Sequence, residues 1–439
     1  MSADLLNRPL HELPATCDVL VVGAGPAGSA AAQTLARAGL DVVLVDQHAF
    51  PRDKVCGDGL IPDAHRALRR LGVHDEVMAL AQPAAHLRCV APRGSHIDVP
   101  GTLAVLPRKQ LDLVLCRAAA AAGARMFAPL RFMEPLQDAA GTVVGARLRA
   151  GTHETRELRA GTHETRELRA GTHETRELRA RWVLLATGAV PQALIAAGAC
   201  ERRTPSAVAL RGYVKNDAMV GHITELEVLW HRRLKPGYAW IFPCPDGVFN
   251  IGVGVGQSHA AGRDGRNVMQ DVNLRDVFAA FTDLYRPARE LMAGGTLLGD
   301  LKGAPLRCSL QGATYAKPGL LVTGEAAGTT YALTGEGIGK ALETGILAAE
   351  AVQAGLQQGV GDAAVRERYE AALLALRPRF AVYDRANSVN EHPWLVDLLV
   401  WSARRNPQRL ARMSGVLEET HLPGNLITAR ALARLVFAR

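Results

Sequence analysis

The pattern of apolar and polar positions predicts a βαβ unit near the start of the chain. Residues 19–22 and 42–45 are short runs that are apolar at every position, which is typical of strands buried on both faces of a parallel sheet. The alanine-rich residues 29–38 between them favour a helix, and Gly39 suits the position just past its end. We therefore expect a parallel α/β fold here.

The pattern changes in the second half of the chain. Residues 209–214, 224–230 and 248–255 alternate between apolar and polar side chains, which predicts a mainly antiparallel sheet with one face in a core. Residues 366–439 predict a helical region. The chain thus combines a parallel α/β part, an antiparallel β part and a helical C-terminal part.

Three glycines give the first unit a chemical meaning. Gly23, Gly25 and Gly28 have the G-x-G-x-x-G spacing, and Asp46 follows the second predicted strand. In this arrangement the glycines allow a tight turn, a close approach to a pyrophosphate and close packing of helix on strand, while the acid accepts hydrogen bonds from a ribose. The helix N-terminus presents free N–H groups to phosphate. The segment therefore predicts a dinucleotide site.

Composition narrows the class of protein. The seven cysteines among the 439 residues are scattered, without a C-x-x-C pair, which argues against a zinc site or a disulfide framework and favours a reducing, cytoplasmic setting. Residues 1–16 lack the apolar core of a signal peptide, and no run is long and apolar enough to span a bilayer. The net charge of +8 comes with no nucleic-acid motif, so we expect no nucleic-acid partner and consider an anionic membrane surface or substrate instead.

A ten-residue unit occurs three times in tandem over residues 151–180. This period is too short for a solenoid. One copy would suffice for a hairpin, so we expect the extra two copies to lengthen a solvent-exposed hairpin or loop without a chemical role. The repeated His153, His163 and His173 have no flanking cysteine, and they do not predict a metal site.

Four further segments carry a family resemblance. Residues 51–60 read Pro-Arg-Asp-Lys-Val-Cys-Gly-Asp-Gly-Leu, and residues 107–115 read Pro-Arg-Lys-Gln-Leu-Asp-Leu-Val-Leu. Residues 238–243 read Tyr-Ala-Trp-Ile-Phe-Pro, and residues 319–350 contain Gly-Glu-Ala-Ala-Gly followed by Thr-Gly-Glu-Gly-Ile. Together they resemble the geranylgeranyl reductase family, a branch of the flavoprotein hydroxylase-like group that also holds flavin halogenases and aromatic monooxygenases.

The resemblance implies FAD as the cofactor. It also shows two departures from the family pattern, since Glu325 replaces an aspartate and Ala332 replaces a proline in the loop after Tyr331. The first shifts a ribityl contact and the second alters the flavin loop. The implied FAD-binding residues are Gly23, Gly25, Ala27, Gly28, Asp46, Gln47, Arg52, Cys56, Gly57, Arg108, Thr187, Gly188, Gly324, Glu325, Gly335, Gly337 and Ile338.

The predicted fold class is a Rossmann-like FAD-binding domain with an inserted, mainly antiparallel β substrate domain and a C-terminal helical tail. The FAD-binding domain is expected to comprise residues 1–83, 107–200 and 305–365. The substrate domain is expected to comprise residues 84–106 and 201–304, and the helical region residues 366–439.

The implied reaction is hydride transfer from reduced flavin to a C=C bond of an isoprenoid chain. The expected substrate is a hydrophobic small molecule or lipid, and NAD(P)H or another external reductant, such as an electron-donor protein, would reduce the flavin. Candidate catalytic residues are Cys56, Tyr238 and Trp240. Each has a structural alternative, because Cys56 can be a packed thiol and the two aromatic residues can fill the sheet core. The acid that protonates the alkene is not identified.

Two other functions remain open. A flavin monooxygenase or halogenase acting on an aromatic or natural-product substrate is the alternative enzyme, although Tyr238 and Phe242 depart from the halogenase Trp-x-Trp-x-Ile-Pro signature. A non-catalytic flavin-binding scaffold is the third. Residues 394–401, which are flanked by Arg404 and Arg405, suit either a helix packed on the protein or peripheral contact with a membrane.

Overall fold

The computed structural model describes residues 5–151, 174–256, 259–261, 267–269 and 272–421. Residues 152–173, which include the first two repeat copies except Gly151 and the start of the third, lie outside these ranges, and so do His153, His163 and His173. Strands β8 and β9, on either side of residues 152–173, pair antiparallel, and β9 begins inside the third repeat copy.

The first sheet has eight strands around β1 (Thr16–Val22). Strand β1 pairs parallel with β2 (Val42–Val45) on one side and with β9 (Thr175–Leu185) on the other. The strand order is β18-β19-β9-β1-β2-β6, and β7 and β8 join through β9. The other strands of this sheet are β6 (Arg125–Phe127), β7 (Leu130–Gln137), β8 (Val143–Ala150), β18 (Ala316–Lys317) and β19 (Leu320–Val322).

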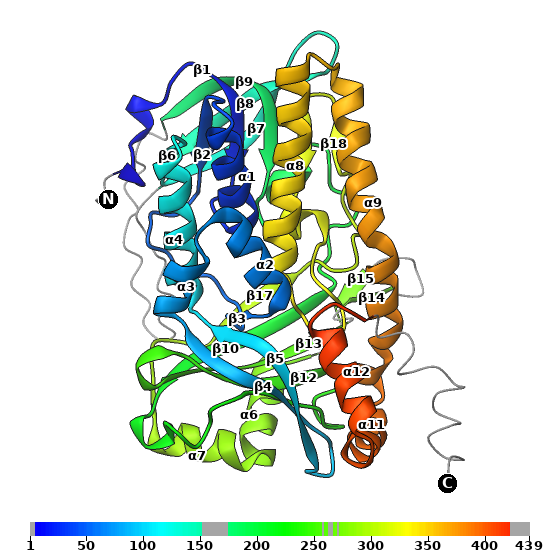
Figure 1. The fold of residues 1–439 in the computed structure, drawn as a ribbon. Coiled ribbons are helices and arrows are strands. Elements are labelled where there is room, and N and C mark those ends of the chain that lie inside the picture. Colours follow the sequence, from blue (N-terminus) through cyan, green and yellow to red (C-terminus); the bar gives the residue numbers. More distant parts are fainter. Residues whose placement is uncertain (1–4, 152–173, 257–258, 262–266, 270–271, 422–439) are drawn as a thin grey trace.

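Helices cover one face of this sheet. Helix α1 (Pro26–Arg37) packs on α4 (Arg108–Ala121) and α8 (Ile338–Gln358), and α9 (Asp362–Ala386) packs on α8 (Figure 1). Helix α1 begins three residues before the predicted residue 29, because Pro26 suits a first helical turn, where its missing N–H removes no hydrogen bond. Gly28 therefore lies inside the helix.

The second sheet has nine strands in the order β16-β10-β13-β12-β11-β4-β5-β3, and β17 pairs with β10. Its pairs are antiparallel except for β4 and β11, which are parallel. Helices α6 (Leu274–Leu284) and α7 (Arg286–Gly294) lie below this sheet in Figure 1. The strands are β3 (Gly59–Leu60), β4 (Gln82–Val90), β5 (His96–Val105), β10 (Ala207–Lys215), β11 (Leu226–Leu229), β12 (Gly237–Pro243), β13 (Val248–Gly256), β16 (Thr296–Leu297) and β17 (Lys302–Leu306).

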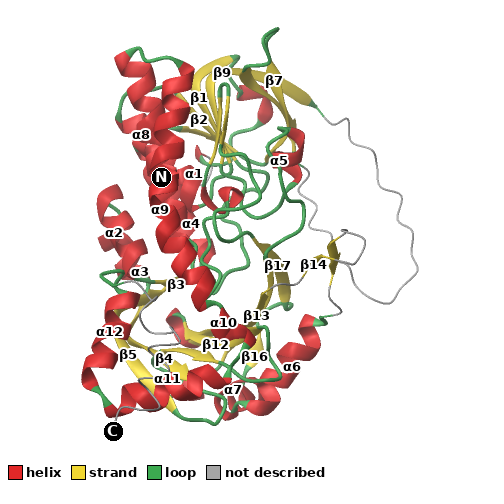
Figure 2. Cartoon of the chain, turned by 90° about the vertical axis from the view of Figure 1, so that its right-hand side faces the viewer, coloured by secondary structure: helices red, strands yellow, loops and turns green. Residues whose placement is uncertain are grey.

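The C-terminal helices pack against the second sheet at strands β4 and β5. Helices α11 (Trp394–Arg405) and α12 (Pro407–Leu417) lie beside β4 and β5 (Figure 2), and their apolar side chains share a core with those strands. Within the described ranges, no helix has the length and apolar character needed to cross a membrane. The remaining elements are α2 (Pro62–Leu71), α3 (His74–Leu80), α5 (Gln192–Ala196), α10 (Ser388–Glu391), the two-stranded β14 (His259–Ala261) and β15 (Asn267–Met269), and the short 3-10 helices η2 (Leu10–Glu12), η3 (Asp217–Met219), η4 (Pro245–Gly247) and η5 (Gly324–Ala327).

Candidate functional site

The turn between β1 and α1 is built for close backbone approach. Gly23 has φ +102°, and a Cβ at Gly28 would lie only 1.8 Å from the carbonyl oxygen of Gly23. Only glycine fits both positions, so α1 packs tightly on β1 with its N-terminus at the end of the strand. Asp46 accepts hydrogen bonds from the N–H groups of Ala24 and His48, both at 2.9 Å. These features fit a bound dinucleotide.

Two arginines stand beside this turn and share one buried acid. Arg108 donates to the two carboxylate oxygens of Asp112 at 2.7 and 2.8 Å, and Arg52 donates to Asp112 at 2.8 Å. Arg52 also lies 3.2 Å from Asp46. Both guanidinium groups lie close to Gly25, at 3.6 and 3.7 Å from a Cβ built there. The turn expected to bind phosphate is therefore flanked by two guanidinium groups whose positions are fixed by hydrogen bonds to Asp112.

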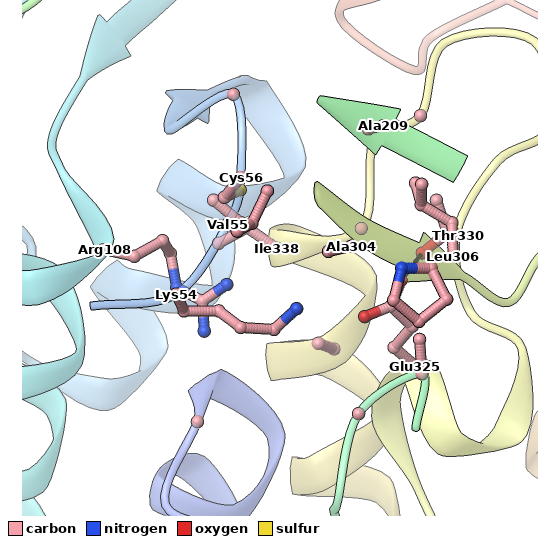
Figure 3. A pocket seen from close by; sticks show the side chains of 18 of the residues that line it. Lys54, Val55, Cys56, Arg108, Ala209, Ala304, Leu306, Glu325, Thr330 and Ile338 are labelled. Carbon is pink, nitrogen blue, oxygen red and sulfur yellow. Dashed lines mark hydrogen bonds between the residues drawn. The ribbon is translucent and has the colours of Figure 1, made fainter. Parts of the chain in front are cut away.

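A second segment faces this turn across a cavity. Figure 3 shows Lys54, Cys56 and Arg108 on one side of the pocket and Glu325 and Thr330 on the other. The hydroxyl of Thr330 donates to the carboxylate of Glu325. A Cβ built on Gly188 would lie 4.0 Å from a carboxylate oxygen of Glu325, so Gly188 is near the same side chain. The two motifs, far apart in the sequence, thus enclose one space that fits a cofactor.

The cavity has a volume of about 750 Å³ and reaches from α1 to the second sheet. Seventeen of the nineteen residues named above as FAD-binding or catalytic candidates line it. The other two, Gly28 and Gly324, lie behind its wall. A Cβ at Gly324 would meet the Cβ of Ala27 at 2.6 Å, so this glycine serves packing of the cofactor-binding elements. The far end of the cavity is apolar, with walls from Leu87, Leu103, Leu226, Val228, Trp230 and Leu417.

The comparisons with known proteins agree with this geometry. The sequence profile of the FAD binding domain family matches residues 16–193. The menaquinone reductase of Mycolicibacterium smegmatis is 32% identical over 77% of this chain and 76% of its own length. Digeranylgeranylglycerophospholipid reductase 1 of Methanopyrus kandleri is 27% identical over 80% of this chain and 84% of its own length.

The chain belongs to the geranylgeranyl reductase family of FAD-dependent oxidoreductases.

Among solved structures, a geranylgeranyl bacteriochlorophyll reductase-like protein from Thermoplasma acidophilum has the same fold, with a TM-score of 0.72, 21% identity and 96% coverage of both chains. The predicted fold class and the predicted family are thereby confirmed. This geranylgeranyl reductase-family protein is an enzyme with an FAD-binding domain. The roles of its individual site residues stay predictions.

The three catalytic candidates all lie at the junction of the cofactor and substrate parts. Tyr238 donates its hydroxyl hydrogen to the carbonyl oxygen of Thr334, in the loop before α8. Trp240 donates its indole N–H to Asn250 at 2.9 Å, and Asn250 in turn donates to the carbonyl oxygen of Cys56 at 2.8 Å. Burial raises the pKa of the Cys56 thiol, so the thiol stays protonated. The two aromatic residues thus wall the cavity and also brace the two loops beside the cofactor site.

Sequence reasoning missed the polar centre of this junction. Asp58 is completely buried and accepts hydrogen bonds from Asn250, from the hydroxyl of Tyr213 and from the N–H of Arg108. Burial raises the pKa of Asp58 to about 6, while its hydrogen-bond donors oppose the rise. Its position between two glycines in the Cys-Gly-Asp-Gly loop was the available signal. Asp58 joins the cofactor loop to strands β10 and β13.

The C-terminal helices complete the cavity. Asn390 in α10 accepts the indole hydrogen of Trp230 at 2.8 Å and donates to the carbonyl oxygen of Leu333 at 3.0 Å. Leu417 at the end of α12 contributes directly to the cavity wall. The helical region therefore forms part of the site and is not a separate appendage. Within the described ranges, no group of histidine, cysteine and acidic side chains is arranged to hold a metal ion.

Proposed function

We propose that this enzyme reduces C=C bonds in the isoprenoid chain of a prenylated quinone. The observation that carries the proposal is the single cavity that connects the FAD-binding turn to an apolar chamber with aromatic walls. An extended apolar chain suits such a chamber because burying it releases water from both surfaces. The menaquinone reductases are 31–32% identical to this chain and the archaeal lipid reductases 27–31%, and the highest of these values, to the menaquinone reductase of Mycolicibacterium smegmatis, supports testing a quinone first.

FAD, when reduced and bound, supplies the hydride for this chemistry. The backbone N–H groups at the start of α1 and the paired Arg52 and Arg108 would hold its pyrophosphate, and Asp46 its ribose. Lys54 extends into the cavity beside Cys56 and would contact the bound cofactor (Figure 3). Tyr238 and Trp240 would hold the substrate chain and exclude water from the reacting bond. NAD(P)H or another external reductant, including an electron-donor protein, would restore reduced FAD.

Helix α11 supports a peripheral membrane contact on the cytoplasmic side. Trp394 and Trp401 lie two turns apart on this helix, with 57% and 45% of their surface exposed. The Arg405 guanidinium stacks on Trp401 at 4.4 Å, and Arg404 is also exposed. Exposed tryptophan beside arginine is typical of helices at an anionic bilayer surface. Such contact would bring the enzyme to its lipid substrate.

The membrane proposal is tested by co-sedimentation with vesicles that contain anionic phospholipid. The variant Trp401→Ser should bind less than wild type, whereas Val220→Ser, at an exposed apolar residue 58% accessible on another part of the surface, should bind equally. Equal loss in both variants, or no binding by wild type, would contradict the proposal.

The reaction is tested with the anaerobically reduced holoenzyme and menaquinone. Because the quinone ring also accepts two electrons, flavin reoxidation alone is not diagnostic, and the product must be analysed by mass spectrometry for two added hydrogens in the prenyl chain. In heavy water, the saturated bond should carry solvent-derived deuterium. A geranylgeranylated glycerophospholipid forms the second arm. If only the phospholipid is saturated, the substrate class is corrected, and if a hydroxylated or halogenated product forms with oxygen, the reductase proposal is wrong.

A further inference from the structure

Alkene reduction requires an acid as well as a hydride, and most acidic side chains in the cavity are already engaged in ion pairs or hydrogen bonds. This inference rests on the reduction proposed above. Asp46 and Asp53 pair with arginines, and both oxygens of Asp58 accept hydrogen bonds. The thiol of Cys56 and the phenol of Tyr238 have raised pKa values, which makes both groups weak proton donors.

Glu336 differs from these groups. Its side chain lines the cavity, and no cation among the described residues lies within ion-pair distance of its carboxyl group. It lies in the loop that ends where α8 begins, between Gly335 and Gly337. The loop is held from both sides, because the backbone N–H of Tyr331 donates to the carbonyl oxygen of Glu336 at 2.9 Å and Tyr238 donates to the carbonyl of Thr334.

The same loop touches the substrate wall. Gly335 has φ +68°, and a Cβ at this position would lie 2.6 Å from the Tyr238 hydroxyl. Glycine is required here because a side chain would push the aromatic wall and the loop apart. Glu336 is therefore placed where the wall of the apolar chamber meets the elements expected to hold FAD.

The charges around Glu336 favour its neutral form. Asp63 of α2 and Glu419 after α12 are acidic neighbours, and Lys340 of α8 is the nearby cation. The Lys340 ammonium is already shared among Glu343 at 2.7 Å, Glu419 at 3.1 Å and Asp63 at 3.5 Å. Burial and the carboxylate of Asp63 raise the pKa of Glu336 to about 8, while the side-chain hydroxyl of Thr334 and the charge of Lys340 oppose the rise. The group is therefore mostly protonated at neutral pH. Tyr238 and Tyr383 are the neutral titratable groups that interact with it.

We propose that Glu336 is the acid that donates a proton to the alkene carbon that does not receive the hydride. The hydride from reduced FAD forms one C–H bond, the Glu336 proton forms the other, and the π bond is lost. Two electrons leave the cofactor, and Glu336 becomes a carboxylate. Water then returns a proton to Glu336, and the external reductant returns two electrons to the cofactor.

The test compares Glu336→Gln with wild type and with Glu343→Gln, which alters the same charged cluster at a residue outside the cavity lining. Each holoenzyme is reduced anaerobically and mixed with menaquinone, and prenyl saturation is followed by quenching and mass spectrometry. Loss of general acid catalysis should slow saturation by about 10²–10⁴-fold in Glu336→Gln, with FAD content unchanged. The control should stay within a few-fold of wild type. The wild-type rate should fall as pH rises through about 8, and the residual rate of Glu336→Gln should lack this fall.

A second readout does not depend on turnover. Infrared spectra of the holoenzyme at pH 7 should show a protonated-carboxyl band that is missing in Glu336→Gln and retained in Glu343→Gln. Absence of this band in wild type overturns the donor assignment. If wild type saturates the prenyl chain and Glu336→Gln does so equally fast, only the donor assignment fails. If wild type leaves the chain unsaturated in both the quinone and phospholipid arms, the reductase proposal itself is wrong, and the donor assignment fails with it.

Discussion

The shared acid Asp112 offers the most direct test of how the FAD-binding turn is built. Its side chain is fully buried and accepts three hydrogen bonds of 2.7 to 2.8 Å from Arg52 and Arg108. Within the described chain, Asp112 is the only ion-pair partner of Arg108, whereas Arg52 also reaches Asp46. Asp112→Asn keeps the shape, removes the charge and turns an amide N–H₂ toward the guanidinium donors. One buried cation then loses its counter-charge.

Breaking a buried ion pair from one side costs about 3–5 kcal/mol, because the remaining charge stays buried and unpaired. This corresponds to roughly 150- to 4000-fold in the unfolding equilibrium constant, at about 1.4 kcal/mol for each factor of ten. The matched control is Glu134→Gln, which removes an exposed partner of Arg147 and should cost at most about 1 kcal/mol.

Urea unfolding of the FAD-free proteins, followed by tryptophan fluorescence, measures this difference without a contribution from cofactor binding. The folded apoproteins are then titrated with FAD. We expect weaker FAD binding by Asp112→Asn, because Arg52 and Arg108 lose the carboxylate that fixes their positions. If Asp112→Asn loses no more stability than Glu134→Gln, the buried cluster does not contribute as its geometry implies, and our account of the FAD-binding turn is wrong.

Three further predictions concern other residues of the site. Gly28→Ala should yield a colourless protein, because the new Cβ would collide with the carbonyl oxygen of Gly23. The control Gly361→Ala adds a Cβ where nothing lies within 4 Å and should bind FAD normally. Absorbance spectra of the purified proteins distinguish the two outcomes. Asn250→Leu removes the hydrogen bond to the Cys56 carbonyl and leaves buried polar groups unpaired, each of which destabilises the folded protein by about 1–3 kcal/mol. The loop that carries Cys56 should then open more often, so alkylation of Cys56, measured by mass spectrometry, should accelerate. An unchanged rate would contradict this. Between about pH 4.5 and 8 the folded protein holds a proton on Glu336 that the unfolded chain releases, so the contribution of Glu336 to the free energy of unfolding falls as pH rises. When unfolding is measured at pH 5 and at pH 9, the free energy of unfolding should fall less in Glu336→Gln than in wild type. Equal falls would refute the raised pKa.

The sequence alone determined the first βαβ unit and the chemistry of its turn. Apolar runs of four residues, alanine-rich helix and glycine spacing are local properties, and the backbone responds to them locally. The structure has β1, α1 and β2 where the pattern indicates them, apart from the earlier starts of β1 at Thr16 and of α1 at Pro26. The alternating runs likewise predicted strands of the second sheet, because period two assigns one face to the core.

Only the tertiary structure decided which side chains meet. Asp58 and Asn250 are 192 residues apart in the chain and bond to each other inside the site. Glu336 acquires its raised pKa from burial first, and then from the carboxylates of Asp63 in α2 and Glu419 after α12, none of which its own sequence neighbourhood reveals. Burial and opposing charge depend on packing between distant segments, and no local pattern encodes them. For the same reason, the closure of the apolar chamber by Trp230, Asn390 and Leu417 became visible only once the sheets and C-terminal helices were in place.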